Sequence, residues 1–222
     1  MLHRFLFAAA LLMAAIVPAS PAHAADPVQG VDYALIDPPV PPKDSGKIEV
    51  VEVFGYSCSH CAHFAPTMSQ WKAKQPADVN VEYLPAAFGG IWEIYARVYY
   101  TAATMGVVDA THDALFKALH EERRPINKLE DIADFYAEHG VNKEQFLSTI
   151  DSFPVNAKLD EARRRAMAYG VDATPTMVVD GKYRIMAGKE GGFERMLQVV
   201  DFLIAKERAA RKASTPVEAT TP

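Results

Sequence analysis

The stretch Val51-Glu52-Val53-Phe54-Gly55-Tyr56-Ser57-Cys58-Ser59-His60-Cys61 joins an apolar run to a Cys-x-x-Cys motif. Residues 47–54 are nearly continuous in apolar side chains, the pattern of a strand that is covered on both faces. After Cys58 the apolar positions recur every three or four residues as far as Trp71, which predicts a helix with Ser57 as its N-cap. A strand therefore leads directly into a helix at the cysteines.

These two cysteines are the only ones in the chain. A spacing of two residues places them one helical turn apart, close enough to form a disulfide and to reopen it. Closing so short a loop removes little entropy from the unfolded chain, roughly 2 kcal/mol, so the pair would be a weak structural crosslink. The unpaired N–H groups and the positive dipole end of a helix N-terminus favour a thiolate at Cys58. The pattern predicts a reactive redox pair.

A helix dipole alone is too weak to activate such a thiol fully. Lowering the pKa of a thiol by about four units needs about 5.5 kcal/mol, whereas a helix terminus supplies roughly 0.3–2 kcal/mol. His60 can add positive charge or an N–H donor, and the backbone amides of His60 and Cys61 can donate hydrogen bonds. A lone histidine is ordinarily a solvated loop residue, but the position of His60 between the cysteines favours a role at the thiol.

The N-terminus is typical of a secretory signal peptide. Arg4 lies in a short basic lead, 13 apolar residues follow at 5–17, and Ala22-His23-Ala24 is a small-x-small cleavage site, so we expect cleavage after Ala24. The apolar run is shorter than the about 20 residues of a membrane-spanning helix, although an uncleaved anchor is the alternative. A protein exported to an oxidising compartment can use disulfides as structural crosslinks. This chain has no cysteines for such a crosslink beyond the reactive pair.

Size and charge limit the partners. Cleavage would leave 198 residues, enough for one sizeable core or one domain with an insertion. Only Arg4 among the charged residues would be lost, so the net charge would change from −5 to −6. An acidic chain does not favour nucleic acid or anionic lipid, and we expect neither as a partner and no stable membrane insertion.

The other segments follow a simple order. The sequence predicts an extended lead-in at 25–46, which can include a short strand at 33–36, and a strand at 78–84. It predicts an all-helical segment at 91–169, with asparagine N-caps at Asn127 and Asn142 and a closing glycine at Gly170. Residues 176–180 and 182–186 predict a hairpin, followed by a helix from Phe193 to about Arg208. Residues 209–222 predict a disordered tail.

This order resembles the thioredoxin fold with a helical insertion, and it is most similar to the periplasmic thiol:disulfide interchange proteins of the DsbA family. The residues that carry the resemblance are Phe54-Gly55-Tyr56-Ser57-Cys58-Ser59-His60-Cys61 and Ala173-Thr174-Pro175-Thr176, and it covers residues 30–208. It implies an α/β (α+β) fold with a mixed sheet. Residues 47–90 and 170–208 would form the thioredoxin-like domain and residues 91–169 the inserted helical domain.

The resemblance implies a role for each residue of the motifs. Cys58 would be the exposed sulfur that attacks and is attacked, and Cys61 the buried resolving sulfur. His60 would stabilise the Cys58 thiolate. Pro175 would be a cis-proline opposite the disulfide that leaves the Thr174 backbone free to pair with a substrate chain, whereas an ordinary trans turn proline is the alternative.

Glu52 lies six residues before the first cysteine, on a strand with a buried pattern. The family has an acid at this place that moves the proton of the buried thiol, and Cys61 must lose its proton before it can close the disulfide. The alternative is a strand acid satisfied by a nearby lysine or by solvent. Two departures are expected to modulate thiolate stability: Ser59 stands where the best-studied members carry proline, and Thr174 where they carry a β-branched apolar residue. No lysine near Glu82 is placed to pair with Glu52.

The predicted function is oxidation of exported proteins with free thiols, by exchange through the disulfide between Cys58 and Cys61, with no other cofactor and no metal. By resemblance the protein would be a periplasmic monomer, reoxidised by an inner-membrane oxidase of the DsbB type. Phe54, Tyr56 and Phe88 could form a shallow groove for unfolded chains. His112, His120 and His139 are expected on helix surfaces, without a role.

Three alternatives remain at this point. A disulfide isomerase or reductase could share the fold, although residues 25–46 leave no room for the dimerisation domain of periplasmic isomerases. A metal or haem module is disfavoured because Ala62, not histidine, follows the second cysteine, and only His60 and His63 lie near it as further ligands. A small-molecule transferase would generally lack the second cysteine.

Overall fold

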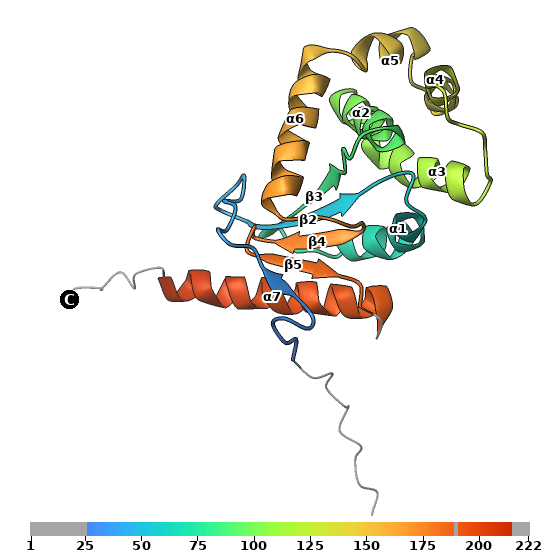
Figure 1. Cartoon of the computed structure of the whole chain (residues 1–222). Helices are drawn as coiled ribbons and strands as arrows, with labels where there is room; N and C mark the ends of the chain where they lie inside the picture. The colour runs from blue at the N-terminus through green and yellow to red at the C-terminus, as the bar shows by residue number, and fades with distance from the viewer. Residues whose placement is uncertain (1–25, 189–190, 215–222) are drawn as a thin grey trace, which may run out of the picture.

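The computed structural model describes residues 26–188 and 191–214 (Figure 1). The signal peptide expected at 1–24 and its cleavage site lie outside these residues. Within the described ranges, no helix has the length and apolar character that crossing a membrane requires.

A five-stranded mixed sheet forms the centre of the fold. Its strands are β1 (Ala34–Leu35), β2 (Ile48–Phe54), β3 (Val79–Pro85), β4 (Thr176–Val179) and β5 (Tyr183–Met186), in the spatial order β1-β5-β4-β2-β3. Strands β2 and β3 are parallel and the other pairs are antiparallel. Every residue of β2 is buried, which explains its continuous apolar pattern. The strand that leads into the cysteines is therefore held between two neighbours, β4 and β3.

Seven helices occur in the described part of the chain. They are α1 (Ser59–Lys72), α2 (Ile91–Thr104), α3 (Val108–His120), α4 (Leu129–Glu138), α5 (Lys143–Thr149), α6 (Phe153–Ala168) and α7 (Gly192–Ser214). Helices α2 to α6 lie between β3 and β4 in the chain, and Figure 1 shows them together beyond the β3 edge of the sheet. Helix α7 packs against β2, β4 and β5. The structure agrees with a thioredoxin-like core that carries a helical insertion.

Several local signals end or begin elements as expected. Asn142 caps α5 by accepting the Gln145 N–H at 2.8 Å. Gly170 follows α6 in the left-handed region, with φ +65°. The Asp180-Gly181 turn joins β4 to β5 with φ of +52° and +62°, the conformation of a tight hairpin. Helix α4 differs, because Lys128 rather than Asn127 is its N-cap residue.

The last helix is longer than the sequence indicated. Helix α7 continues to Ser214, so the prediction of disorder is wrong for residues 209–214, and residues 215–222 lie outside the described structure. Arg211 explains the extension, because its guanidinium donates to Asp180 at 2.6 Å and to the Ser45 carbonyl at 3.0 Å. These contacts anchor the end of the helix to the hairpin turn and to the lead-in.

An aromatic cluster joins the sheet to the insertion. His112 of α3 is buried against Phe54 and stacks on Tyr83 with ring centroids 4.3 Å apart, and its Nδ1 lies 2.9 Å from the Tyr56 hydroxyl. Burial lowers the pKa of His112 to about 3, so the ring is neutral. His120 also contacts this segment, with Nε2 2.7 Å from the Tyr56 carbonyl oxygen. The expectation of a surface position is wrong for His112, which is buried.

The same cluster corrects the expected groove. Phe54 and Tyr56 are fully buried and are core residues, whereas Phe88 is 48 % exposed. Phe88 lies against Trp92, with ring centroids 5.6 Å apart, and Ile91 and Ile94 are also exposed. The apolar surface next to the cysteine turn is therefore formed by Phe88 and the beginning of α2.

Candidate active site

Cys58 itself begins the helix that follows β2. It is the N-cap residue of α1, and its Sγ accepts the Cys61 N–H at 3.2 Å. The expected cap, Ser57, lies one residue earlier, and its buried hydroxyl has no hydrogen-bond partner within the described ranges. The sulfur thus occupies the place where a capping oxygen would normally satisfy a free amide.

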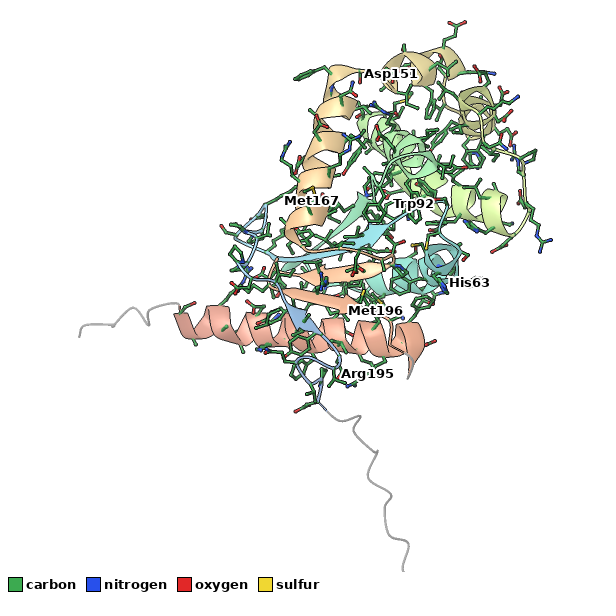
Figure 2. The ribbon with its side chains drawn as sticks, in the orientation of Figure 1. His63, Trp92, Asp151, Met167, Arg195 and Met196 are labelled. Carbon is green, nitrogen blue, oxygen red and sulfur yellow. The ribbon has the colours of Figure 1, made fainter. Side chains whose placement is uncertain are left out.

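A close approach of the Trp92 ring to the backbone at Gly55 fixes the turn before Cys58. A Cβ atom on Gly55 would lie 2.2 Å from the ring of Trp92, which Figure 2 labels on α2. The Cys58 N–H donates to the Gly55 carbonyl at 3.0 Å and closes the turn. Only glycine leaves room for Trp92 here, so helix α2 supports the cysteine turn directly.

The surroundings of Cys58 stabilise its thiolate. Its pKa is lowered to about 5, first by a hydrogen bond from the Cys61 side chain and then by the Thr174 side chain and the backbone amides of Cys61 and His60, against the opposing effect of burial. Cys58 is half-buried, so its sulfur remains reachable. An anionic, accessible sulfur is a nucleophile and a good leaving group.

Cys61 has the opposite character. It is fully buried, and burial together with the neighbouring Cys58 sulfur raises its pKa well above the ordinary thiol value. The two sulfurs of the motif are therefore strongly unlike: one is stable as a thiolate and the other as a thiol. A Cys61 thiolate released from a disulfide would take up a proton.

The loop before β4 lies beside this pair. The Thr174–Pro175 peptide bond is cis, as the resemblance implied, and Pro175 is buried. In its protonated form, Cys58 donates from Sγ to the Thr174 carbonyl oxygen at 3.5 Å. The Thr174 side chain lowers the pKa of both cysteines. This loop brings a residue more than 110 positions away in sequence to the reactive sulfur.

Glu52 is buried beneath the cysteines, with 2 % of its surface exposed. Its pKa is raised to about 8, first by burial and then by the negative charges of Asp113 and Cys58, while Lys72 acts in the opposite direction. At neutral pH the carboxyl group is largely protonated. A protonated acid near a thiol that needs a proton is suited to proton transfer.

The cation near Glu52 comes from an unexpected element. Glu82, where a lysine was sought, belongs to a different group of charges, because its carboxylate pairs with Arg165 and Lys43 at 2.8 Å each. Lys72, at the end of α1, instead contributes the positive charge. The signal was in the sequence, because Lys72 lies 11 residues after Cys61, about three helical turns, and so shares its face.

Ser59 and His60 are exposed at the start of α1. The backbone amide of His60 is one of the groups that lower the pKa of Cys58. Within the described residues, no group of three or more His, Cys, Asp or Glu side chains could hold a metal ion.

A buried acid, an asymmetric pair of thiols and a cis-proline loop thus meet at one end of the sheet. The family model for a DSBA-like thioredoxin domain matches residues 49–198, which include all of these features. The chain belongs to the DsbA family. Family membership fixes the class of the enzyme, which is a thiol:disulfide oxidoreductase with a thioredoxin-like fold.

Individual relatives agree over almost the whole length. The thiol:disulfide interchange protein DsbA of Pseudomonas aeruginosa is 46 % identical over 94 % of this chain and 99 % of its own. A crystal structure of P. aeruginosa DsbA covers 83 % of this chain and 96 % of its own, with a TM-score of 0.79 and 48 % identity. The DsbA oxidoreductase of Xylella fastidiosa is similar at 40 % identity and a TM-score of 0.78, over 82 % and 98 % of the two chains.

Proposed function

We propose that this DsbA-family chain is a dithiol oxidase in which Cys58 is the exchanging sulfur and Cys61 the resolving one. The observation that supports this most strongly is the Cys61 N–H 3.2 Å from the Cys58 sulfur, in surroundings that lower the Cys58 pKa to about 5. Stabilising the thiolate stabilises the reduced protein, and therefore makes the disulfide more oxidising.

The proposed reaction has two steps. A substrate thiolate attacks Cys58, a new disulfide joins it to the substrate, and the bond between Cys58 and Cys61 breaks so that Cys61 leaves as a thiolate. A second substrate thiolate then attacks the substrate sulfur of this mixed disulfide, and Cys58 leaves as a stable thiolate. The substrate loses two electrons and gains a disulfide, and the enzyme becomes a dithiol.

Glu52 would serve the first step. The departing Cys61 thiolate accepts the proton of the Glu52 carboxyl group, whose pKa of about 8 keeps it protonated at neutral pH. When the enzyme is reoxidised, the proton returns to Glu52 so that Cys61 can attack. The burial of both groups supports this exchange, because water has little access to either.

The remaining residues of the two motifs would position the substrate chain and adjust the stability of the Cys58 thiolate. The Thr174 backbone, next to the cis-Pro175, would pair with a substrate chain beside the Cys58 sulfur. The Thr174 hydroxyl and the position of Ser59 would adjust thiolate stability, and a charged His60 ring would add to it. The exposed Phe88 and the first turn of α2 would offer apolar contact to unfolded chains.

The cellular setting follows from the N-terminus. Residues 1–24 would direct export to the periplasm, with cleavage after Ala24, where a monomeric enzyme would act on exported proteins that carry free thiols. An inner-membrane oxidase of the DsbB type would regenerate the disulfide. N-terminal sequencing of the protein from a periplasmic extract tests the cleavage site.

Oxidation of a peptide with two cysteines tests the activity. We expect one equivalent of oxidised enzyme to form one peptide disulfide, and Cys58→Ser and Cys61→Ser, which cannot form the disulfide between Cys58 and Cys61, to form none. A parallel assay with scrambled disulfides in glutathione buffer measures isomerisation. If the enzyme rearranges scrambled disulfides faster than it oxidises the peptide, it is an isomerase and the oxidase proposal is wrong.

A further inference from the structure

A cleft separates helix α1 from helix α3 of the insertion, beside the cysteine turn. The two helices lie next to each other in Figure 1 and pack against each other. Their side chains leave a space of about 320 Å³. It is lined by Ala62, His63, Ala65 and Pro66 of α1 and by Asp113, Phe116, Lys117, His120 and Glu121 of α3 and its C-cap. The cleft is therefore separate from the exposed apolar surface at Phe88 and the beginning of α2.

Small side chains on α1 create this space. Ala62 and Pro66 lie four residues apart, so they occupy the same side of the helix. Ala62 is part-buried and Pro66 is exposed, whereas Ala65 is buried. Packed helices ordinarily fill the gap between them with interlocking side chains, and alanines leave that gap open. The α1 wall of the cleft is therefore apolar and low, and His63, which Figure 2 labels on α1, is exposed beside it.

Helix α3 supplies a wall of a different character. Phe116 and His120 lie one helical turn apart, with ring centroids separated by 6.2 Å. The His120 ring is held in place, because its Nε2 lies 2.7 Å from the Tyr56 carbonyl oxygen. Lys117 is exposed at the rim, where its ammonium lies 3.8 Å from the Glu122 carboxylate. This wall combines two rings with a cation.

The size and chemistry of the cleft suit an aromatic side chain. An apolar cavity of about 150 Å³ holds benzene, so a space of about 320 Å³ admits a ring system as large as indole. Such a ring would pack on Ala62 and Pro66 and meet the Phe116 ring on the other wall. The Lys117 ammonium offers the ring a cation–π contact. An aliphatic side chain would gain the apolar contact alone.

The cleft is within reach of a substrate bonded to Cys58. Ala62 lies four residues after Cys58, about 6 Å along the helix axis. The Ala62 N–H donates to the Cys58 carbonyl at 3.0 Å, so α1 is regular over this turn. An extended chain advances about 3.3 Å per residue, so a side chain two residues from the substrate cysteine spans that distance. The bond to Cys58 would deliver this side chain at high effective concentration.

We propose that the cleft between α1 and α3 is a substrate subsite that binds an aromatic side chain close to the reacting cysteine of the substrate. The inference rests on the proposed exchange at Cys58, which brings the substrate chain beside the cleft. The ring enters the cleft as the substrate thiolate attacks Cys58, and its burial stabilises both this encounter and the mixed disulfide that results. Substrates with an aromatic residue two positions from a cysteine are therefore oxidised faster than substrates without one.

Pairs of peptides that differ at one residue test the subsite. Each peptide has two cysteines and carries either tryptophan or alanine two residues before the first cysteine, or two residues after it. The rate constant for reduction of oxidised enzyme is measured by rapid mixing and acid quench and is divided by that for glutathione, which has no aromatic ring. In one of the two pairs we expect the tryptophan peptide to react about tenfold faster than the alanine peptide. One pair suffices because the substrate chain crosses Cys58 in a single direction.

Substitutions at Ala62 separate the cleft from other apolar surfaces. Ala62→Phe places a ring in the cleft and should bring the ratio of the two rates to about one. Ala62→Ser is the matched control, because it keeps the cleft open, and its ratio should stay near ten. Phe88→Ala removes the exposed ring near α2 and should also keep the ratio near ten. The proposal is overturned if wild type shows no preference, if Ala62→Phe and Ala62→Ser behave alike, or if Phe88→Ala abolishes the preference.

A binding measurement without catalysis keeps the outcomes distinct. Indole is titrated into the oxidised protein, and the backbone amide signals are followed by NMR. We expect shifts at residues 62–66 and 116–121, which Ala62→Phe should remove. Shifts that are absent from residues 62–66, or confined to residues 88–94, would overturn the subsite. If the enzyme oxidises none of the peptides, the proposed function fails and the subsite with it, whereas equal oxidation of all peptides means that the subsite alone is wrong.

Discussion

Replacing Glu52 by glutamine should make the reduced protein more stable as the pH rises. The folded protein raises the pKa of this carboxyl group from 4.5 to about 8. Between these values the folded state holds a proton that the unfolded chain has lost, so the ionisation of Glu52 lowers the stability of the wild type as the pH increases. Glutamine carries no charge at any pH in this range and removes that dependence.

The magnitude follows from the pKa difference. Each unit corresponds to 1.36 kcal/mol, so Glu52 costs the wild type about 3 kcal/mol at pH 7 and about 5 kcal/mol above pH 8. Because Glu52 is only 2 % exposed, solvent screens this cost little. A buried amide without a partner adds an opposing cost of roughly 1–3 kcal/mol that does not vary with pH. The decisive quantity is therefore the change between pH 5 and pH 8.5.

Urea unfolding with excess reductant at pH 5, 7 and 8.5 measures this change. We expect the free energy of unfolding of Glu52→Gln, relative to wild type, to rise by about 4 kcal/mol over that range. Glu82→Gln is the matched control, because it removes a carboxylate that pairs with Arg165 and Lys43. It should be less stable than wild type at pH 7. A difference between Glu52→Gln and wild type that stays constant from pH 5 to 8.5 would refute the assigned pKa.

Three further predictions concern the cysteine turn. Thr174→Val should raise the pKa of Cys58, measured by thiolate absorbance, because a hydrogen bond to the thiolate is lost. Thr174→Ser keeps the hydroxyl and should leave the Cys58 pKa near 5. Equal Cys58 pKa values in the two variants would contradict this role of Thr174. In thermal melts, the stability of the reduced protein relative to the oxidised protein should increase from pH 5 to pH 8. The lowered folded-state pKa of Cys58 contributes stability that is lost as the pH falls through about 5. A difference in melting temperature that does not change with pH would exclude this contribution. Gly55→Ala should destabilise the protein by about 1–3 kcal/mol in urea, and adding Trp92→Leu should recover part of the loss.

Short stretches of sequence determine the secondary-structure elements of this fold. The buried strand β2 follows from its unbroken apolar run, and the start of α1 at the cysteines follows from the change to helical spacing. The hairpin turn at Asp180 and the end of α6 at Gly170 were predictable because both need a left-handed backbone. The resemblance supplied what periodicity cannot, the cis bond before Pro175.

The errors have a common cause in contacts between distant segments. Helix α7 extends past Arg208 because Arg211 meets Asp180 and Ser45, neither of which the helix pattern itself reveals. His112 shares a helical face with Leu115 and Phe116, so its spacing did signal burial. The polar ring of His112 nevertheless indicated a surface position. Its hydrogen-bond partner in the core, the Tyr56 hydroxyl, lies 56 residues earlier and cannot be recognised from the helix pattern.

By itself, the sequence determined which residues could do chemistry: two cysteines at the start of a helix, an acid on the preceding strand and a proline before a late strand. Only the tertiary structure decided how they behave. The raised pKa of Glu52 arises from burial and from Asp113, 61 residues away, and the lowered pKa of Cys58 arises partly from Thr174, 116 residues away. Burial and charge act through space, so their effect on an ionisable group depends on how the chain packs and not on its neighbours in sequence.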